Sequence, residues 1–152
     1  MDLIKYEGVN NNTDKNIEEF RQFTTSLTVC IPYDRESINV ITKVWVEAEL
    51  KQSHIIKTPI GLSFEGQTLT GNKVLILGDL NVKLEYTSQN DSTSINTLNM
   101  GIPISSYVVV EEDFDDYLTA YPSFEVEDIY CKKLNDREFY LSISMLSIAD
   151  IF

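Results

Sequence analysis

The residues whose spacing comes nearest to a chemical motif lie in the stretch SFEGQTLTGNK, residues 63–73, with two glycines followed by a lysine. A phosphate-binding loop needs the lysine directly after the second glycine, then a Ser or Thr, and a helix whose N-terminus holds the phosphates. Here Asn72 separates Gly71 from the lysine, and Val74 stands where a hydroxyl side chain is needed. We therefore predict that Gly71 and Asn72 form a turn entering a strand, not a nucleotide site.

A second candidate for chemistry is the acidic window from Glu111 to Asp128, which contains no Lys or Arg and carries −8 of the net charge of −12. Such a window can bind divalent cations, meet a basic partner, or only keep the protein in solution. It lacks the glycine of an EF-hand frame, so weak calcium binding and a solvated loop both stay open. Its aromatic residues either pack in the core or form an acidic–aromatic contact surface. The candidate interaction residues are Glu111, Glu112, Asp113, Asp115, Asp116, Tyr117, Tyr121, Glu127 and Asp128.

The remaining inventory for catalysis is small. His54 is the one histidine, and no Ser or Cys lies in a nucleophile-elbow sequence. A Cys–His pair requires an electropositive setting for its thiol, whereas Cys30 lies between two apolar residues of an acidic chain. We predict that Cys30 and Cys131 are buried free thiols rather than a disulfide, and that zinc is excluded for lack of ligands. No catalytic, cofactor-binding or metal-ligating residue is assigned, and we expect no enzymatic activity.

Composition limits the class of protein further. A chain of 152 residues with 43% hydrophobic content suits one domain with a real core. The net charge of −12 argues against nucleic acids and anionic membranes as partners. No run of 18 apolar residues exists, and the N-terminus lacks a basic region followed by an apolar one. We therefore expect no membrane insertion, no secretory signal peptide and synthesis in the cytoplasm.

The elements that must position these residues are strands, because apolar and polar side chains alternate with period two along most of the chain. The clearest apolar row is Val74, Ile76, Leu80, Val82, Leu84 and Tyr86. Further strands are predicted at 24–31, 38–50, 53–59, 93–100, 103–110, 124–133 and 138–148, with turns at 32–36, 88–93, 101–103 and 134–137. This pattern predicts an all-β fold, either an antiparallel β-sandwich or a barrel-like domain.

Two local irregularities complete the expected organisation. Asp14 can cap a short helix IEEFRQF after a flexible arm at 1–13, so we divide the chain into an arm at 1–20, part of it helical, and one β domain at 21–152. In the strand at 124–133 the apolar alternation slips, which predicts a β-bulge at Glu127 and Asp128.

Several stretches, each occurring once and in a fixed order along the chain, together resemble a known family. They are Gln22–Phe23, Ile31–Pro32, Leu77–Tyr86, Ile102–Val110 and Val126–Tyr130, with a closing hairpin strand to Ile148. In order and spacing they resemble the SPOCS domain of spore-forming clostridia and their relatives, over roughly residues 21 to 150. The resemblance implies an all-β binding or assembly module without catalytic residues or cofactors. In a well-known member, a spore coat morphogenesis protein, SPOCS regions precede a LysM domain, whereas here we expect a single SPOCS unit without LysM.

The resemblance leads to two hypotheses of function. The first is a structural protein of the spore envelope (coat, exosporium or surface layer) that self-assembles or scaffolds assembly, made in the mother-cell cytoplasm and assembled on the spore surface. Its partners would be itself, as a homo-oligomer or polymer, or other spore coat proteins. The second is an adaptor that binds a basic protein through the acidic window. Self-assembly would use the apolar ends of the chain, unless these ends only cover their own sheet; the end residues are Leu3, Ile4, Tyr6, Ile151 and Phe152.

Overall fold

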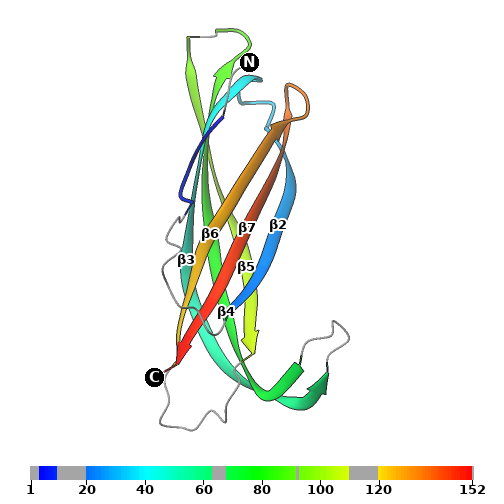
Figure 1. Ribbon diagram of the computed structural model, residues 1–152. Helices are drawn as coiled ribbons and strands as arrows, with labels where there is room; N and C mark the ends of the chain where they lie inside the picture. The colour runs from blue at the N-terminus through cyan, green and yellow to red at the C-terminus, as the bar shows by residue number, and fades with distance from the viewer. Residues whose placement is uncertain (1–3, 10–19, 63–67, 92, 110–119, 152) are drawn as a thin grey trace.

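The computed structural model describes residues 4–9, 20–62, 68–91, 93–109 and 120–151. Within these ranges the chain consists of strands and their connections (Figure 1). One sheet has four strands, in the order β1 (Lys5–Glu7), β3 (Ile38–Leu62), β4 (Thr68–Ser88) and β5 (Ile95–Val109). The other sheet has three strands, in the order β2 (Phe20–Cys30), β7 (Glu138–Ile151) and β6 (Ala120–Lys133). The two sheets pack face to face, which confirms the predicted all-β sandwich.

The four-stranded sheet is built on two long strands, β3 and β4, which pair antiparallel from Ile38↔Ser88 to Leu62↔Thr68. Every residue of the predicted apolar row on β4 is buried, with an exposed fraction of at most 2%. Burying each such side chain stabilises the fold by roughly 1.5–3 kcal/mol, and this gain fixes which face of the strand points inward. The largest fully buried side chains include Tyr86, Ile76, Leu80 and Leu84 of this sheet and Phe139 and Leu141 of β7.

The three-stranded sheet has one regular and one irregular ladder. β2 pairs with β7 without interruption from Phe20↔Ile148 to Cys30↔Glu138. β6 pairs with the other side of β7, and its register shifts between Val126 and Asp128. This shift confirms the bulge that was predicted where the apolar alternation slips.

The N-terminal region differs from the prediction. The helix expected after Asp14 does not include its last residues, because Phe20–Phe23 begin β2; residues 14–19 lie outside the described ranges. Pairing with β7 gives these residues a complete backbone ladder, and this tertiary contact outweighs a local helix propensity. Within the expected arm, Lys5–Glu7 form β1, which pairs parallel with β3 through Tyr6↔Val44.

Two predicted turns are also wrong. Gly71 and Asn72 lie inside β4, where Asn72 pairs with Lys57 of β3. The segment 101–103 continues β5, which is one strand and not two. The predicted break between 50 and 53 is an irregularity in the register of a continuous β3. Gly and Pro mark turns in the sequence, but both are also tolerated at an edge strand, and β5 is one.

Candidate functional site

Half of the acidic window, residues 111–119, lies outside the residues that the structure describes, including Glu111, Glu112, Asp113, Asp115, Asp116 and Tyr117. Of Tyr121 only the place in β6 is described, opposite Asp150. Glu127 and Asp128 are both exposed at the bulge of β6. The Glu127 carboxylate accepts hydrogen bonds from Gln22 Nε2 at 3.3 and 3.4 Å, and Asp128 Oδ1 accepts one from the Ile129 backbone N–H at 2.9 Å. Across the described ranges, no group of three His, Cys, Asp or Glu residues is placed to hold a metal.

The apolar ends of the chain are described only in part, since Leu3 and Phe152 lie outside the described residues and Ile151 is described as the backbone partner of Ala120. Ile4 and Tyr6 pack against the protein's own core. The Tyr6 hydroxyl accepts a hydrogen bond from the Cys131 backbone N–H at 3.0 Å and lies 3.3 Å from its carbonyl oxygen, to which it donates. Burial raises the pKa of Tyr6, which keeps this hydroxyl protonated. Ile4 and Tyr6 are therefore occupied within one chain.

The two cysteines have different environments. Both are free thiols, but only Cys131 is buried, and burial raises its pKa to about 12. Cys30 is exposed, contrary to prediction, because it occupies an outward position of β2, whose exposed and half-buried residues alternate. His54, the other candidate for nucleophilic chemistry, is exposed on β3.

A cavity of about 980 Å³ is bounded by residues of β1, β3, β4 and β5 on one side and β6 on the other. Its apolar lining, including Val46, Val82 and Phe124, belongs to the core or packs on it. On its rim, Glu7 lies 2.9 Å from the Lys43 ammonium, whose hydrogen bond lowers the pKa of the Glu7 carboxyl. This carboxylate is therefore engaged in an ion pair at the cavity, whose lining also includes Glu47 and Glu125.

The edges of the two sheets differ in how far they could pair with a strand of another chain. A sheet edge presents unpaired N–H and C=O groups that can pair with another strand, and natural proteins obstruct such edges. The edge at β1 is only three residues long and bears the Lys5 and Glu7 side chains. The edge at β6 is occupied at Cys131 by the Tyr6 hydroxyl, and nearby Lys133 Nζ donates to the Asn39 carbonyl oxygen of β3 at 3.0 Å. The β1 strand is thus short, and the β6 edge is occupied near its C-terminal end.

The edge at β5 is obstructed in two places. Arg35 Nη1 donates to the carbonyl oxygen of Thr97 at 3.1 Å, so the backbone groups of Thr97 point away from β4. Along an antiparallel strand, the backbone N–H and C=O groups of successive residues point alternately to one side and the other. The β4–β5 register has no shift, so Pro103, six residues after Thr97, also points its backbone away from β4. A proline has no N–H to offer a further strand. Arg35 and Pro103 therefore leave only a short free stretch of this edge between them.

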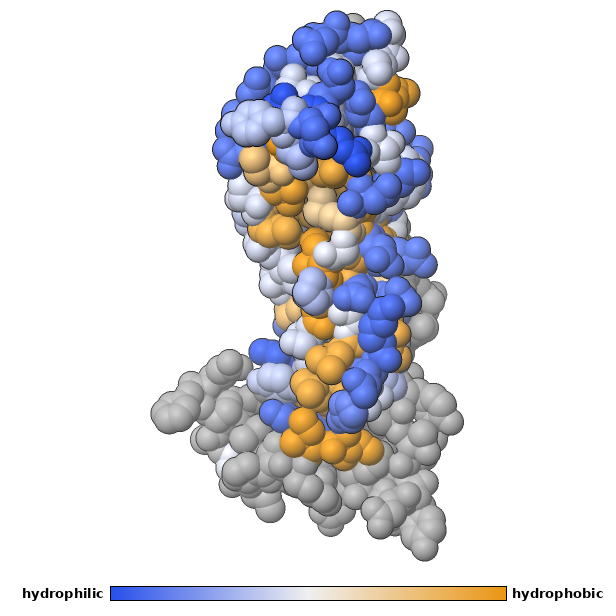
Figure 2. All heavy atoms as spheres, turned by 180° about the vertical axis from the view of Figure 1, so that it is seen from behind, coloured by the Kyte–Doolittle hydropathy of each residue, from blue (hydrophilic) through white to orange (hydrophobic). Residues whose placement is uncertain are grey.

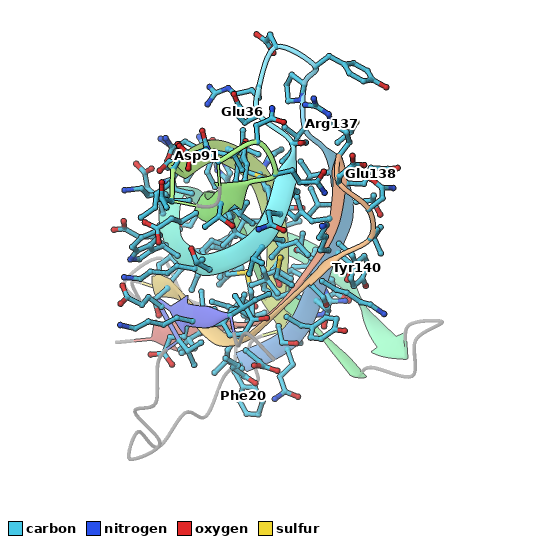
Figure 3. All side chains as sticks on the ribbon, turned by 90° about the horizontal axis from the view of Figure 1, so that it is seen from above. Phe20, Glu36, Asp91, Arg137, Glu138 and Tyr140 are labelled. Carbon is cyan, nitrogen blue, oxygen red and sulfur yellow. The ribbon has the colours of Figure 1, made fainter. Side chains whose placement is uncertain are left out.

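The edge at β2 is not obstructed in this way. The Ile31 N–H donates to the Arg137 carbonyl oxygen at 2.7 Å and continues the β2–β7 register, so odd-numbered residues point their backbone groups at β7. The even-numbered residues point theirs outward, and no strand among the described residues pairs with them. None of these residues is charged or proline, and all are exposed: Phe20, Gln22, Thr24, Ser26, Thr28 and Cys30. The Phe20 side chain, half exposed, points away from the sandwich (Figure 3).

The edge strands β2 and β5 are also poor in charge. In a chain with 24% charged residues, β5 has no charged residue and β2 has one, Arg21. Several of their inward apolar side chains are only partly buried; these are Phe23, Leu27 and Val29 on β2 and Leu98, Met100 and Ile102 on β5. Seen from behind, hydrophobic residues form an interrupted strip along the molecule between hydrophilic ones (Figure 2). The β2 edge was not predicted from the sequence, because a Thr/Ser-rich strand has the same pattern at an edge as inside a sheet.

These features define an all-β sandwich module in which the edge of β2 has no paired strand among the described residues. Residues 37–134, more than half of the chain, match the family model of the SipL SPOCS domain, and the protein belongs to the SPOCS domain family. The resemblance noted in the sequence is thereby confirmed, and membership indicates a sporulation-related role. No curated protein and no solved structure matches the chain. In the part of the chain that the structure describes, no helix has the length and apolar composition of a membrane span.

Proposed function

We propose that this protein is a non-catalytic structural component of the spore envelope, in the coat, exosporium or surface layer, that self-assembles or scaffolds assembly. Membership of the SPOCS domain family supports the sporulation setting. The observation that carries the assembly role is the unobstructed edge of β2. In this proposal the protein is made in the mother-cell cytoplasm and assembles on the spore surface with itself or with other coat proteins.

The physical argument rests on the length and chemistry of that edge. Its outward residues from Phe20 to Cys30 span roughly 34 Å at the usual strand rise. Each backbone hydrogen bond that an added strand makes contributes about 0.5–1.5 kcal/mol net, so a strand of this length gains several kcal/mol. A soluble protein that stays monomeric normally blocks such an edge with charge, proline or a covering segment. Among the described residues, side-chain contacts or a proline occupy parts of the edges at β6 and β5, whereas the outward residues of β2 include no charge and no proline and have no paired strand.

The test is the solution mass of the purified protein by light scattering on a sizing column, over a series of concentrations and with or without millimolar calcium. Self-assembly predicts a mass that rises with concentration above the 17.4 kDa of one chain. A calcium-dependent rise would give the acidic window a role in assembly. A mass of one chain in every buffer would contradict self-assembly and leave scaffolding of another protein.

A second candidate is an adaptor that binds a basic protein partner during coat morphogenesis. The observation that favours it is the exposure of Glu127 and Asp128 at the β6 bulge, within the most acidic part of the sequence. Neutralising Asp115, Asp116, Glu127 and Asp128 should then weaken capture of basic coat proteins, and added salt should weaken it too. Neutralising the exposed Asp34 and Asp136 is the matched control. Binding that ignores both salt and the four substitutions would argue against an adaptor.

A further inference from the structure

We propose that the free edge of β2 pairs with β2 of a second copy of this chain. The two strands run antiparallel about a two-fold axis at Thr25, so that the two three-stranded sheets become one continuous six-stranded sheet. This inference rests on the proposed self-assembly and identifies β2 as the surface through which two copies first bind. It concerns an edge whose outward residues are all described and exposed.

The choice of a second copy follows from charge. Two chains that each carry a net charge of −12 repel one another, and they approach most easily where neither presents an acid. The β2 strand FRQFTTSLTVC contains no acidic residue. A basic partner would find no acid on β2 itself, and the neighbouring Glu127 carboxylate already accepts hydrogen bonds from Gln22. An acidic partner would meet the same net repulsion without symmetry in its favour. An identical strand supplies the same neutral backbone ladder, and a two-fold axis uses each contact twice.

The register follows from the pairing geometry. With Thr25 opposite Thr25 of the second copy, all eleven residues of β2 are paired, which no shifted register achieves. Phe23 then faces Leu27 of the second copy, and this aromatic–aliphatic pair occurs twice. On the outer face Thr24 meets Ser26 of the second copy, and hydroxyl pairs of this kind also favour strand pairing. The pairing further covers Phe23 and Leu27, which are only partly buried in one chain.

The axis position provides a direct test by disulfide cross-linking. Thr25 points its backbone groups at β7, so Thr25 and its symmetry mate form a non-hydrogen-bonded pair with Cα atoms about 4.5 Å apart. That separation lies within the range of a disulfide. In a Cys30→Ser background, mild oxidation of Thr25→Cys should give a cross-linked dimer as the main product. The matched control is Asn99→Cys on the β5 edge, which is exposed and should give at least tenfold less dimer.

Blocking the edge provides the second test. Ser26 points its N–H outward, so Ser26→Pro removes no backbone hydrogen bond to β7, only the exposed hydrogen bond from Ser26 Oγ to Ser142 Oγ at 3.1 Å, and it prevents pairing with another strand. It should raise the dissociation constant of the dimer at least tenfold, while Asn99→Pro on the β5 edge leaves it unchanged. If circular dichroism shows that Ser26→Pro is unfolded, the double variant Thr24→Lys with Ser26→Lys replaces it. In the proposed register this variant places lysines opposite lysines and should give the same loss.

The outcomes separate this inference from the proposed function. A protein that forms dimers or larger assemblies in which Thr25→Cys does not cross-link, and which Ser26→Pro does not weaken, keeps self-assembly and overturns pairing through β2. Loss of assembly in Asn99→Pro alone would move the contact to β5 and overturn it as well. A parent protein that stays monomeric at every concentration overturns both this inference and self-assembly, and leaves scaffolding of another protein.

Discussion

The hydroxyl of Tyr6 lies 3.0 Å from the backbone nitrogen of Cys131 and 3.3 Å from its carbonyl oxygen. One side chain of β1 therefore satisfies outward backbone groups of β6, which belongs to the opposite sheet. The contact links the sheets and occupies an edge where a further strand would otherwise pair. Although β1 is only three residues long, it therefore contributes a contact between the two sheets.

Tyr6→Phe should destabilise the protein by about 1–3 kcal/mol, because the Cys131 backbone groups lose their partner in a partly buried place. Urea unfolding followed by circular dichroism measures the difference. Tyr33→Phe is the control, since Tyr33 is 88% exposed and its hydroxyl should contribute little. Equal midpoints for Tyr6→Phe and the parent would show that the contact does not stabilise the fold.

The two cysteines should differ sharply in reactivity. Cys30 is exposed, whereas burial raises the pKa of Cys131 to about 12 and leaves almost no thiolate at neutral pH. A maleimide reagent should label one thiol of the native protein quickly and the second only after unfolding in guanidinium. Native Cys30→Ser should take up no label on the same timescale. Two equally fast thiols in the native parent would contradict this arrangement.

Gly78 and Gly101 form a matched pair of glycines inside strands. A Cβ atom at Gly78 would lie 2.3 Å from the Glu49 carbonyl oxygen and 2.8 Å from Phe124 Cε2, whereas one at Gly101 meets nothing within 4 Å. Gly78→Ala should therefore cost about 1–3 kcal/mol or more through forced shifts of backbone and ring. Gly101→Ala should be close to neutral. Thermal melting of both variants tests the difference, and equal effects would mean that the approach of Phe124 to β4 is loose.

The ion pair of Glu7 and Lys43 should make the docking of β1 sensitive to acid. The Lys43 hydrogen bond lowers the pKa of Glu7 below its ordinary value of 4.5. A carboxyl whose pKa is lower in the folded state stabilises that state above its unfolded pKa, and this contribution is lost as the pH falls through the folded pKa. Glu7→Gln should thus lower the melting temperature at neutral pH, by a modest amount because the pair is on the surface.

The same comparison at low pH gives the control for this prediction. At pH values well below the lowered pKa of Glu7 in the folded state, the carboxyl is protonated in both states, so parent and Glu7→Gln should melt alike. A difference that persists unchanged at acid pH would assign the effect to packing and not to charge. Asp34→Asn, a change at an exposed acid in the turn after β2, should show no such dependence.

Local pattern was enough to predict several features of the fold. The alternation that places Val74, Leu80 and Tyr86 on one face reflects burial of every second residue, so the buried face of β4 can be predicted from the sequence. The slip at Glu127 and Asp128 predicted the bulge for the same reason. The turns predicted from glycine and proline at 71–72 and 101–103 were wrong, because both residues also occur within strands at places where pairing permits them.

The sequence by itself thus determined the all-β class, the inward faces, the acidic balance and the family to which the chain belongs. Only the tertiary structure decided which strands lie at edges and which edges are covered. That decision depends on contacts between residues far apart in the chain, such as Tyr6 and Cys131, 125 positions from each other. A strand carries the same alternating pattern whether one or two neighbours pair with it, so the open edge of β2 is a property of the assembled sheets.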